Sequence, residues 1–249
     1  WFIDHSGNVI SKHPEKPDWS MYDESDGVID TPNRILCGKD GTVWVSGAHS
    51  GMAAVSYLEN DKWRRQTFPD AGNILSHLSA IETADGAVLF GAGTPQTVLG
   101  QRSGGAVVFR KVDGNYNGAH LEPPLFPART ANMVERENDG LWYGAGTLMH
   151  RQGSWVLGPE STELFQEYWI DHMITDQNND LWVAYWGTGI YQYNGKEWFL
   201  HNEANGLGSN QVIHLMNGKW QTGVWATTAQ GLSRYDGRSW SNWSLSSNV

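Results

Sequence analysis

The sequence has little of what marks several common classes of protein. Its single cysteine, Cys37, excludes an internal disulfide framework and a zinc site built from several cysteines. Only 18 % of its 249 residues are charged, below the usual roughly 25 %, and its net charge is −10. No run of Lys or Arg indicates a nucleic-acid groove, so we expect no nucleic-acid partner. No apolar run reaches the roughly 18 residues that span a bilayer.

The chain begins abruptly with Trp1-Phe2-Ile3, which has no initiator Met and resembles the middle of a strand. We therefore expect a piece of a longer protein, in which the lack of a targeting signal says little. What the sequence has in excess is aromatic and flexible residues, with 14 Trp and 29 Gly. So many aromatic residues argue against disorder, because they bury enough apolar surface to fold.

An anchor residue, usually Trp, recurs along the chain at intervals of 40 to 53 residues. The six anchors are Trp1, Trp44, Leu89, Trp142, Trp182 and Trp225. After an anchor come small residues, a short alternating run such as Gly189–Tyr193, an Asn-Gly or Asp-Gly turn, and an aromatic strand. No segment shows a sustained helical period. Four short strands in about 40–45 residues is the pattern of a β-propeller blade.

We name the four strands of a repeat A (a run that often begins with Asn), B (the anchor), C and D (the outer aromatic strand). The sequence predicts an all-β, single β-propeller domain over residues 1–249, with four-stranded antiparallel blades and six visible repeats. An incomplete seven-bladed ring is the alternative. The anchor Trp should pack between neighbouring sheets. Residues 86–131 diverge from the repeat, and we expect an insertion around Asn115–Pro127.

The segments Asn-Asp-Leu-Trp-Val-Ala, Gly-Thr-Gly-Ile-Tyr-Gln-Tyr and Gly-Leu-Ser-Arg-Tyr between Asn179 and Tyr235 resemble the two-component regulator propeller repeat. The resemblance extends over the whole chain and is weakest in residues 86–131. It implies a periplasmic or extracellular sensor module of a bacterial signalling protein. It further implies membrane-anchored signalling domains in the same chain, and a homodimer is possible.

Binding residues are expected where the D–A and B–C connections meet, because a rigid scaffold presents variable loops at that end. Tyr185 and Trp186 interrupt the small residues that follow the anchors, and an exposed Trp is a typical platform for a sugar ring. The full set of candidates for a carbohydrate or small polar ligand is Trp186, Tyr185, Trp169, His172, His49, Asn210, Asn132 and Asn33. The recurrent Asn residues have a structural alternative, since each would cap its own D–A turn. Trp220, in an A–B turn, is a candidate for a partner contact.

Two other functions stay open, a protein-interaction scaffold and a metal-dependent lyase similar to the streptogramin lyase group. His49, His77, His172 and His214 are placed for a lyase, but the one His-x-Glu pair, His201 with Glu203, follows an outer strand. No Ser/His/Asp set or calcium loop of the D-x-D-x-D-G type is recognisable. We therefore expect a ligand-binding protein that is not an enzyme and has no metal or cofactor.

Overall fold

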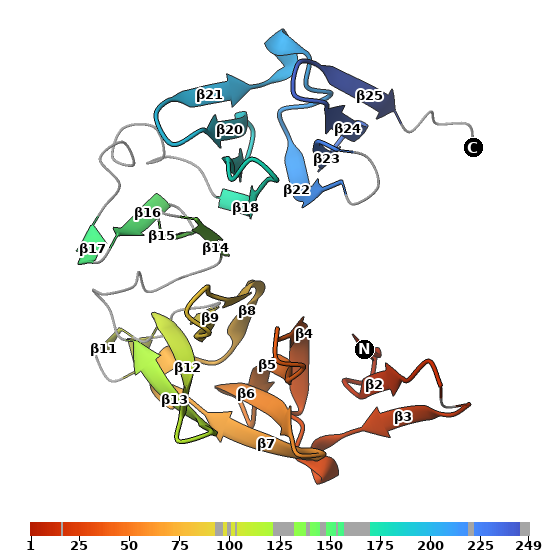
Figure 1. Ribbon diagram of the computed structural model, residues 1–249, viewed down its shortest axis with the longest axis vertical. Helices are drawn as coiled ribbons and strands as arrows, with labels where there is room; N and C mark the ends of the chain where they lie inside the picture. Colours follow the sequence, from red (N-terminus) through yellow and green to blue (C-terminus); the bar gives the residue numbers. More distant parts are fainter. Residues whose placement is uncertain are drawn as a thin grey trace. The chain divides into compact units, whose positions relative to one another are not determined.

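The computed structural model describes residues 1–15, 17–92, 97–98, 101–102, 104–121, 132–137, 140–144, 148–152, 154–156, 170–218 and 222–244 (Figure 1). The chain divides into two compact units, residues 1–131 (unit 1) and 132–249 (unit 2). Each unit consists of successive antiparallel sheets in which consecutive strands pair. Among the described residues, none forms a helix with the length and apolar character needed to cross a bilayer.

Unit 1 contains three blade sheets. The first has three strands, β1 (Phe2–Ile3), β2 (Val9–Lys12) and β3 (Trp19–Tyr22). The second has four, β4 (Thr31–Cys37), β5 (Val43–His49), β6 (Met52–Glu59) and β7 (Lys62–Thr67). The third is formed by β8 (Leu75–Glu82), β9 (Val88–Ala92), β12 (Ala106–Val112) and β13 (Asn115–Leu121). The first sheet corresponds to strands B to D of the predicted repeat.

The third sheet corrects the predicted position of the insertion. Residues Asn115–Leu121 form the regular outer strand β13, which pairs with β12 along its whole length. The extra length lies instead in the B–C connection between Ala92 and Ala106. That connection contains the short hairpin of β10 (Thr97–Val98) and β11 (Gln101–Arg102). Divergence from the repeat pattern does not distinguish a strand of unusual sequence from an inserted loop, so the insertion was predicted at the wrong place.

Unit 2 contains three four-stranded sheets. The first consists of β14 (Asn132–Arg136), β15 (Gly140–Gly144), β16 (Leu148–Gln152) and β17 (Ser154–Val156). The second consists of β18 (Ile170–Thr175), β19 (Leu181–Tyr185), β20 (Gly189–Tyr193) and β21 (Trp198–His201). The third consists of β22 (Val212–Asn217), β23 (Val224–Thr228), β24 (Gly231–Tyr235) and β25 (Trp240–Ser244). Within the described parts of both units, short 3-10 turns join strand D to the next strand A at Glu24–Asp26 (η1), Pro69–Ala71 (η2) and Glu203–Asn205 (η3).

The cores lie between consecutive sheets. In unit 1, Trp44 packs against Tyr57 of its own sheet and Phe109 of the next, with ring centroids 4.9 and 5.0 Å apart. In unit 2, Trp182 is fully buried in the cluster that joins the second and third sheets. Burial of such rings on both sides removes large apolar areas from water, which stabilises the fold by about 25 cal/mol for each Å² buried. The anchors therefore hold neighbouring blades together.

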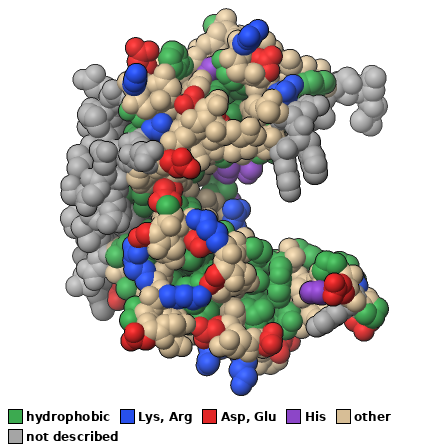
Figure 2. Space-filling model, viewed as in Figure 1, with side chains coloured by type: hydrophobic (Ala, Val, Ile, Leu, Met, Phe, Trp, Pro, Cys, Tyr) green, Lys and Arg blue, Asp and Glu red, His purple; other side chains and the backbone are tan. Residues whose placement is uncertain are grey.

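The anchors are not equally buried. Trp44, Leu89, Trp142 and Trp182 are buried, and Trp225 is half-buried. Trp1 is 43 % exposed and precedes β1, the edge strand of its three-stranded sheet among the described residues. The four-stranded antiparallel sheets and their inter-sheet cores confirm the predicted all-β propeller class. The single-domain extent and the choice between six and seven blades stay predictions. On the face seen in Figure 2, acidic and basic side chains are interspersed among the described residues.

Candidate functional site

Tyr185 and Trp186, predicted as neighbouring ligand contacts, have opposite environments. Tyr185 ends β19 and is fully buried in the core between the first two sheets of unit 2, where burial raises the pKa of its hydroxyl. Trp186 begins the β19–β20 turn and is 48 % exposed. The difference arises because Tyr185 is the last residue of a strand that is buried on both faces, whereas Trp186 lies beyond the strand in the turn. Tyr185 therefore packs in the core, and only Trp186 offers a surface to a ligand.

Asn33 and Asn132 link neighbouring blades. The Asn33 Nδ2 donates to the carbonyl of Leu75 at 2.8 Å, and the Asn132 Nδ2 donates to the carbonyl of Ile170 at 3.0 Å. Both acceptors are the first residues of the next strand A. The amides therefore satisfy backbone groups at the start of the next sheet, rather than capping their own turn as the structural alternative proposed.

Asn210 does not lie on an inner strand. It exchanges two hydrogen bonds with Glu203, as its Oδ1 accepts from the Glu203 amide at 2.8 Å and its amide donates to Glu203 Oε1 at 2.9 Å. The pair fastens η3 to the segment before β22. The position equivalent to Asn132 and His172 is occupied by His214, because each of these three precedes the partner of its anchor by two residues. Sequence alignment of the Asn residues missed this register.

His172 and His214 stack on adjacent inner strands, β18 and β22, with ring centroids 3.9 Å apart and planes at 28°. The Leu215 amide donates to His172 Nδ1 at 3.3 Å, so a neutral His172 carries its proton on Nε2. Next to His172, Asp171 lies in a bulge of β18, and burial raises the pKa of its carboxyl to about 6. Unit 2 therefore places titratable side chains on two inner strands.

His49, the remaining described candidate, is in unit 1 at the end of β5. Its Nδ1 lies 3.3 Å from Asp30 Oδ2 and its Nε2 lies 3.9 Å from Glu24 Oε1. Trp169, and Trp220 of the A–B turn, lie outside the described residues.

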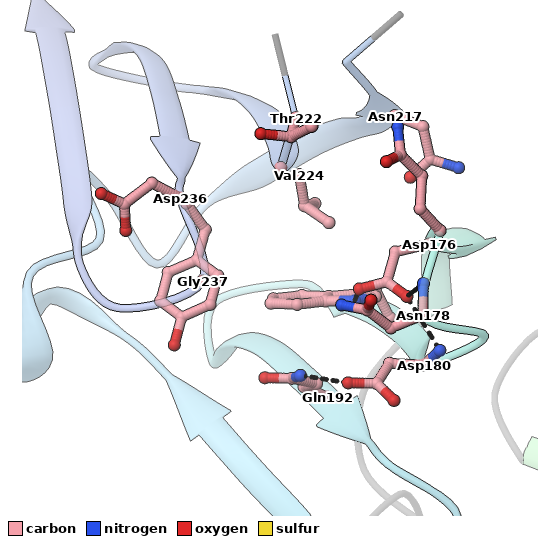
Figure 3. A pocket seen from close by; sticks show the side chains of 13 residues that line it. Asp176, Asn178, Asp180, Gln192, Asn217, Thr222, Val224, Asp236 and Gly237 are labelled. Carbon is pink, nitrogen blue, oxygen red and sulfur yellow. Dashed lines mark hydrogen bonds between the residues drawn. The ribbon is translucent and has the colours of Figure 1, made fainter.

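A cavity in unit 2 lies at the other end of the blades, where the A–B turns of the second and third sheets meet the C–D turn of the third (Figure 3). It has a volume of about 380 Å³. Its described lining is polar and aromatic: Asp176, Gln177, Asn178, Asp180, Trp182, Gln192, Asn217, Thr222, Gly223, Val224, Tyr235, Asp236 and Gly237. The three carboxylates have no Lys or Arg among these described lining residues. The sequence instead predicts such Asp and Asn residues as turn formers and predicts binding at the opposite end.

Asp176 builds one wall of this cavity. Its Oδ1 accepts from the amides of Asn178 and Asp180, both at 2.9 Å, which closes the β18–β19 turn. Its Oδ2 accepts from the anchor Trp182 Nε1 at 3.0 Å. Asp176 is therefore occupied by structural bonds, and it holds the anchor indole at the cavity.

A chain of hydrogen bonds orients Asp180, which shares that turn. Trp240 Nε1 donates to His201 Nδ1 at 3.2 Å, so the neutral His201 carries its proton on Nε2. His201 Nε2 then donates to Gln192 Oε1 at 2.9 Å, and Gln192 Nε2 donates to Asp180 Oδ2 at 2.6 Å. The Trp240 indole can only donate a hydrogen bond, and the ionised Asp180 carboxylate can only accept one. These two groups therefore fix the direction of each hydrogen bond between them.

Burial also changes the pKa values of the residues in this series of hydrogen bonds. Burial lowers the pKa of His201 to about 4. Burial raises the pKa of Asp180, and the nearby negative charge of Asp176 adds to the rise. Asp236, by contrast, accepts bonds from the backbone amides of Ser239 and Arg238, which lower its pKa. The cavity thus contains a half-buried, oriented carboxylate, Asp180, and an exposed, ionised one, Asp236.

Neither a scan of protein-family models nor a search of curated proteins found a match. The resemblance to the two-component regulator propeller repeat therefore stays a prediction at the level of family. Solved structures do match, and the likenesses described next, at 14–19 % sequence identity, concern the fold.

PorZ, described as a bacterial surface component of the type-IX secretion system of Porphyromonas gingivalis, has a TM-score of 0.62 at 16 % identity, over 82 % of this chain and 32 % of its own. The extracellular domain of the candidate one-component system BT4673 of B. thetaiotaomicron has a TM-score of 0.56 at 19 % identity, over 93 % and 28 %. YCF48 from Cyanidioschyzon merolae has a TM-score of 0.53 at 14 % identity, over 92 % and 76 %. The chain thus spans about a third or less of the first two proteins.

Proposed function

We propose that this chain is an extracytoplasmic ligand-binding propeller that senses a carbohydrate or another small polar ligand, as part of a bacterial signalling protein. The observation that carries the proposal is the polar cavity between the second and third sheets of unit 2. The extracellular location of the BT4673 domain and the surface location of PorZ support this compartment. Membrane-anchored signalling domains in the same chain, and a homodimer, belong to this proposal.

The cavity suits a ligand rich in hydroxyl groups. Asp180 Oδ2 accepts a hydrogen bond from Gln192, which leaves Oδ1 to accept one from a ligand. The Asn217 Nδ2 donates to the Thr175 carbonyl at 2.6 Å, which leaves its Oδ1 as an acceptor facing the same space (Figure 3). A sugar hydroxyl donates to such acceptors, and an aromatic edge supplies apolar contact. The excess of carboxylates in the described lining disfavours an anionic ligand.

A second polar cavity, in unit 1, shows why the cavity in unit 2 is the better candidate. It has a volume of about 330 Å³ and is lined by turns of the second and third sheets. There the carboxylate of Asp40 is already bound by Lys111 and accepts from the Tyr116 hydroxyl at 2.8 Å. Its principal acceptor is therefore neutralised within the protein, whereas Asp180 is oriented by an uncharged amide.

Signal transmission follows from the position of the cavity. Its walls come from two consecutive sheets, so a bound ligand contacts both and favours one relative arrangement of them. The buried Trp182, which lines the cavity and packs in the core between those sheets, connects ligand contact to blade packing. A ligand would thereby shift the population of blade arrangements that a membrane-anchored partner domain reads.

The experiment is a binding screen of the purified chain against neutral mono- and disaccharides, by saturation-transfer NMR followed by calorimetry. Asp180→Asn removes one negative charge and replaces one oxygen acceptor by an amide donor, so we expect at least a 10-fold loss of affinity. Asp61→Asn is the matched control, because Asp61 is an exposed turn residue with φ +59°, which Asn tolerates. Equal loss in both variants would show a general charge effect and contradict the assignment.

Trp186→Ala distinguishes binding at one end of the blade from binding at the other, because Trp186 lies in a B–C turn and the cavity lies at the A–B and C–D turns. If the originally predicted surface with Trp186, His172 and Asn132 binds the sugar, this variant loses affinity and Asp180→Asn does not. The reverse result supports the cavity. A chain that binds no member of the saccharide panel contradicts the carbohydrate proposal.

A further inference from the structure

Three potential metal ligands converge in unit 1, whereas the cavity proposed for the sugar belongs to unit 2. One ring nitrogen of His49 and one oxygen each of Glu24 and Asp30 lie within 4.8 Å of one another. They come from three different segments: the turn η1, the residue before β4, and the end of β5. We propose that Glu24, Asp30 and His49 bind a divalent transition-metal ion, with Zn²⁺ as the fitting case.

The backbone around these residues is already held in place. The Ser50 amide donates to Asp30 Oδ2 at 2.7 Å, which ties the β5–β6 turn to the connection before β4. The Thr31 hydroxyl donates to Asp30 Oδ1 at 2.9 Å. These bonds leave lone pairs on each carboxylate oxygen. Asp30 therefore keeps a defined orientation and can still coordinate an ion.

The turn that carries Glu24 is equally well defined. Asp23 caps η1 by accepting from the Ser25 amide at 2.8 Å, and Asp26 accepts from the Asp23 amide at 3.0 Å. Gly27 then ends the turn with φ +107°, a conformation that favours glycine. The side chain of Glu24 itself is 60 % exposed, so it can change rotamer at little cost.

His49 is the ligand that needs a partner. Its side chain is only 13 % exposed, and its Nδ1 is buried without a hydrogen bond to any described residue. Asp30 Oδ2 is 3.3 Å away but not in line for a bond. A buried ring nitrogen without a partner costs free energy, which coordination of a metal ion would recover.

The geometry nearly fits a single ion. Ligand atoms at about 2.0–2.2 Å from Zn²⁺ lie roughly 3 to 3.5 Å apart in tetrahedral coordination. The separation of 3.3 Å between His49 Nδ1 and Asp30 Oδ2 already fits. Glu24 Oε1 lies 3.9 Å from the other ring nitrogen, Nε2, so the exposed Glu24 side chain has to change rotamer to reach an ion held by Nδ1 and Asp30. An imidazole with two carboxylates suits Zn²⁺ and its transition-metal neighbours better than Ca²⁺ or Mg²⁺, which prefer oxygen ligands. Water would complete the coordination.

Such an ion would clamp the connection before β4 to the β5–β6 turn. This function is independent of sugar binding, because all three ligands belong to unit 1 and the cavity belongs to unit 2. The sequence predicts His49 as a ligand contact and predicts no metal site. The carboxylate partners were not apparent there, because Glu24 and His49 are separated by a whole D–A connection and two strands.

The test is a calorimetric titration of the full chain, stripped with EDTA, with ZnCl₂. We expect one zinc ion per chain and a rise in melting temperature on binding. Glu24→Gln keeps the shape of an exposed side chain and should weaken binding at least about 10-fold, as should His49→Gln. Glu15→Gln, an exposed residue of the same unit outside the cluster, is the matched control and should bind as the wild type does.

Cobalt provides a second measurement. Co²⁺ bound by His49 gives visible absorption bands that His49→Gln should abolish, while circular dichroism confirms that the variant folds. The proposal is overturned if the wild type binds no zinc at millimolar concentration, or if both variants bind it with wild-type affinity and stoichiometry. In the latter case other groups, such as the exposed His13, hold the ion. Asp180→Asn should leave zinc binding unchanged, so failure here and failure of the sugar proposal are distinguishable.

Discussion

His201 makes the stability of unit 2 depend on pH in a defined direction. The imidazole is 9 % exposed, stacks on Trp182 at 5.0 Å, and accepts from Trp240 on Nδ1. A second proton would have to occupy the nitrogen at which the indole N–H already points. Burial lowers the pKa from 6.5 to about 4, so the folded state binds this proton less readily than the unfolded state.

The magnitude follows from that difference. Each unit of pKa corresponds to about 1.4 kcal/mol, so the shift is equivalent to about 3 kcal/mol. Above pH 6.5 the group is neutral in both states and contributes no pH dependence. Between pH 6.5 and 4 only the unfolded chain takes up the proton, so the free energy of unfolding falls as the pH falls. Asp171, whose pKa is raised to about 6, acts in the opposite direction over the same range.

A comparison of variants separates the two groups. Urea unfolding of the wild type and His201→Gln, followed by Trp fluorescence, is measured from pH 4.5 to 7.5. We expect the stability of the wild type relative to His201→Gln to decrease by up to about 1.4 kcal/mol per pH unit below pH 6.5. His77→Gln is the control, because His77 is exposed on β8. In NMR, the His201 ring should titrate near pH 4, and Trp240→Phe, which removes the donor, should raise that pKa.

The reasoning fails if the stability difference between wild type and His201→Gln is constant over this pH range. It also fails if the His201 ring titrates near 6.5 in the folded protein. Either result would mean that the imidazole is open to water, and that the bonds from Trp240 to Asp180 do not hold it neutral.

Four further predictions concern packing and the binding surfaces. Trp44→Ala should lower the free energy of unfolding by about 3–5 kcal/mol in denaturant titration, because it empties the core between two sheets; a loss below 1 kcal/mol would contradict the anchor role. Asn132→Ala should cost about 1–3 kcal/mol, since it leaves the Ile170 carbonyl without its donor, whereas an exposed Asn115→Ala should cost far less. Trp186→Ala should change stability by less than about 0.5 kcal/mol, and a larger loss would show that this indole packs rather than binds. Gly223→Ala should be strongly destabilising by thermal melting, because φ is +121° and a Cβ would lie 2.1 Å from the Tyr235 carbonyl oxygen; a wild-type melting temperature would refute that contact.

The repeat, the four strands per period and the structural role of most Trp residues were predictable from the sequence. The reason is that these depend on local signals: alternation along a strand, Asn-Gly and Asp-Gly turns, and a large apolar residue at one position of each repeat. The buried state of Tyr185 was also within reach, because it occupies the next inward position of its strand after Val183. Tyr185 was instead predicted as a ligand contact, because it is an aromatic residue next to Trp186.

The sites depended on contacts between sheets. His172 and His214 are brought together because β18 and β22 lie side by side, and the bulges in both strands set which residues align. Asp180 is oriented by Gln192 and His201 of its own blade, and Trp240 of the next blade fixes His201 through one bond between the blades. The sequence by itself determined the blade, since strand pairing within a repeat is local. Only the tertiary structure decided which side chains of different repeats meet, because one register step or rotamer moves a polar group from one partner to another.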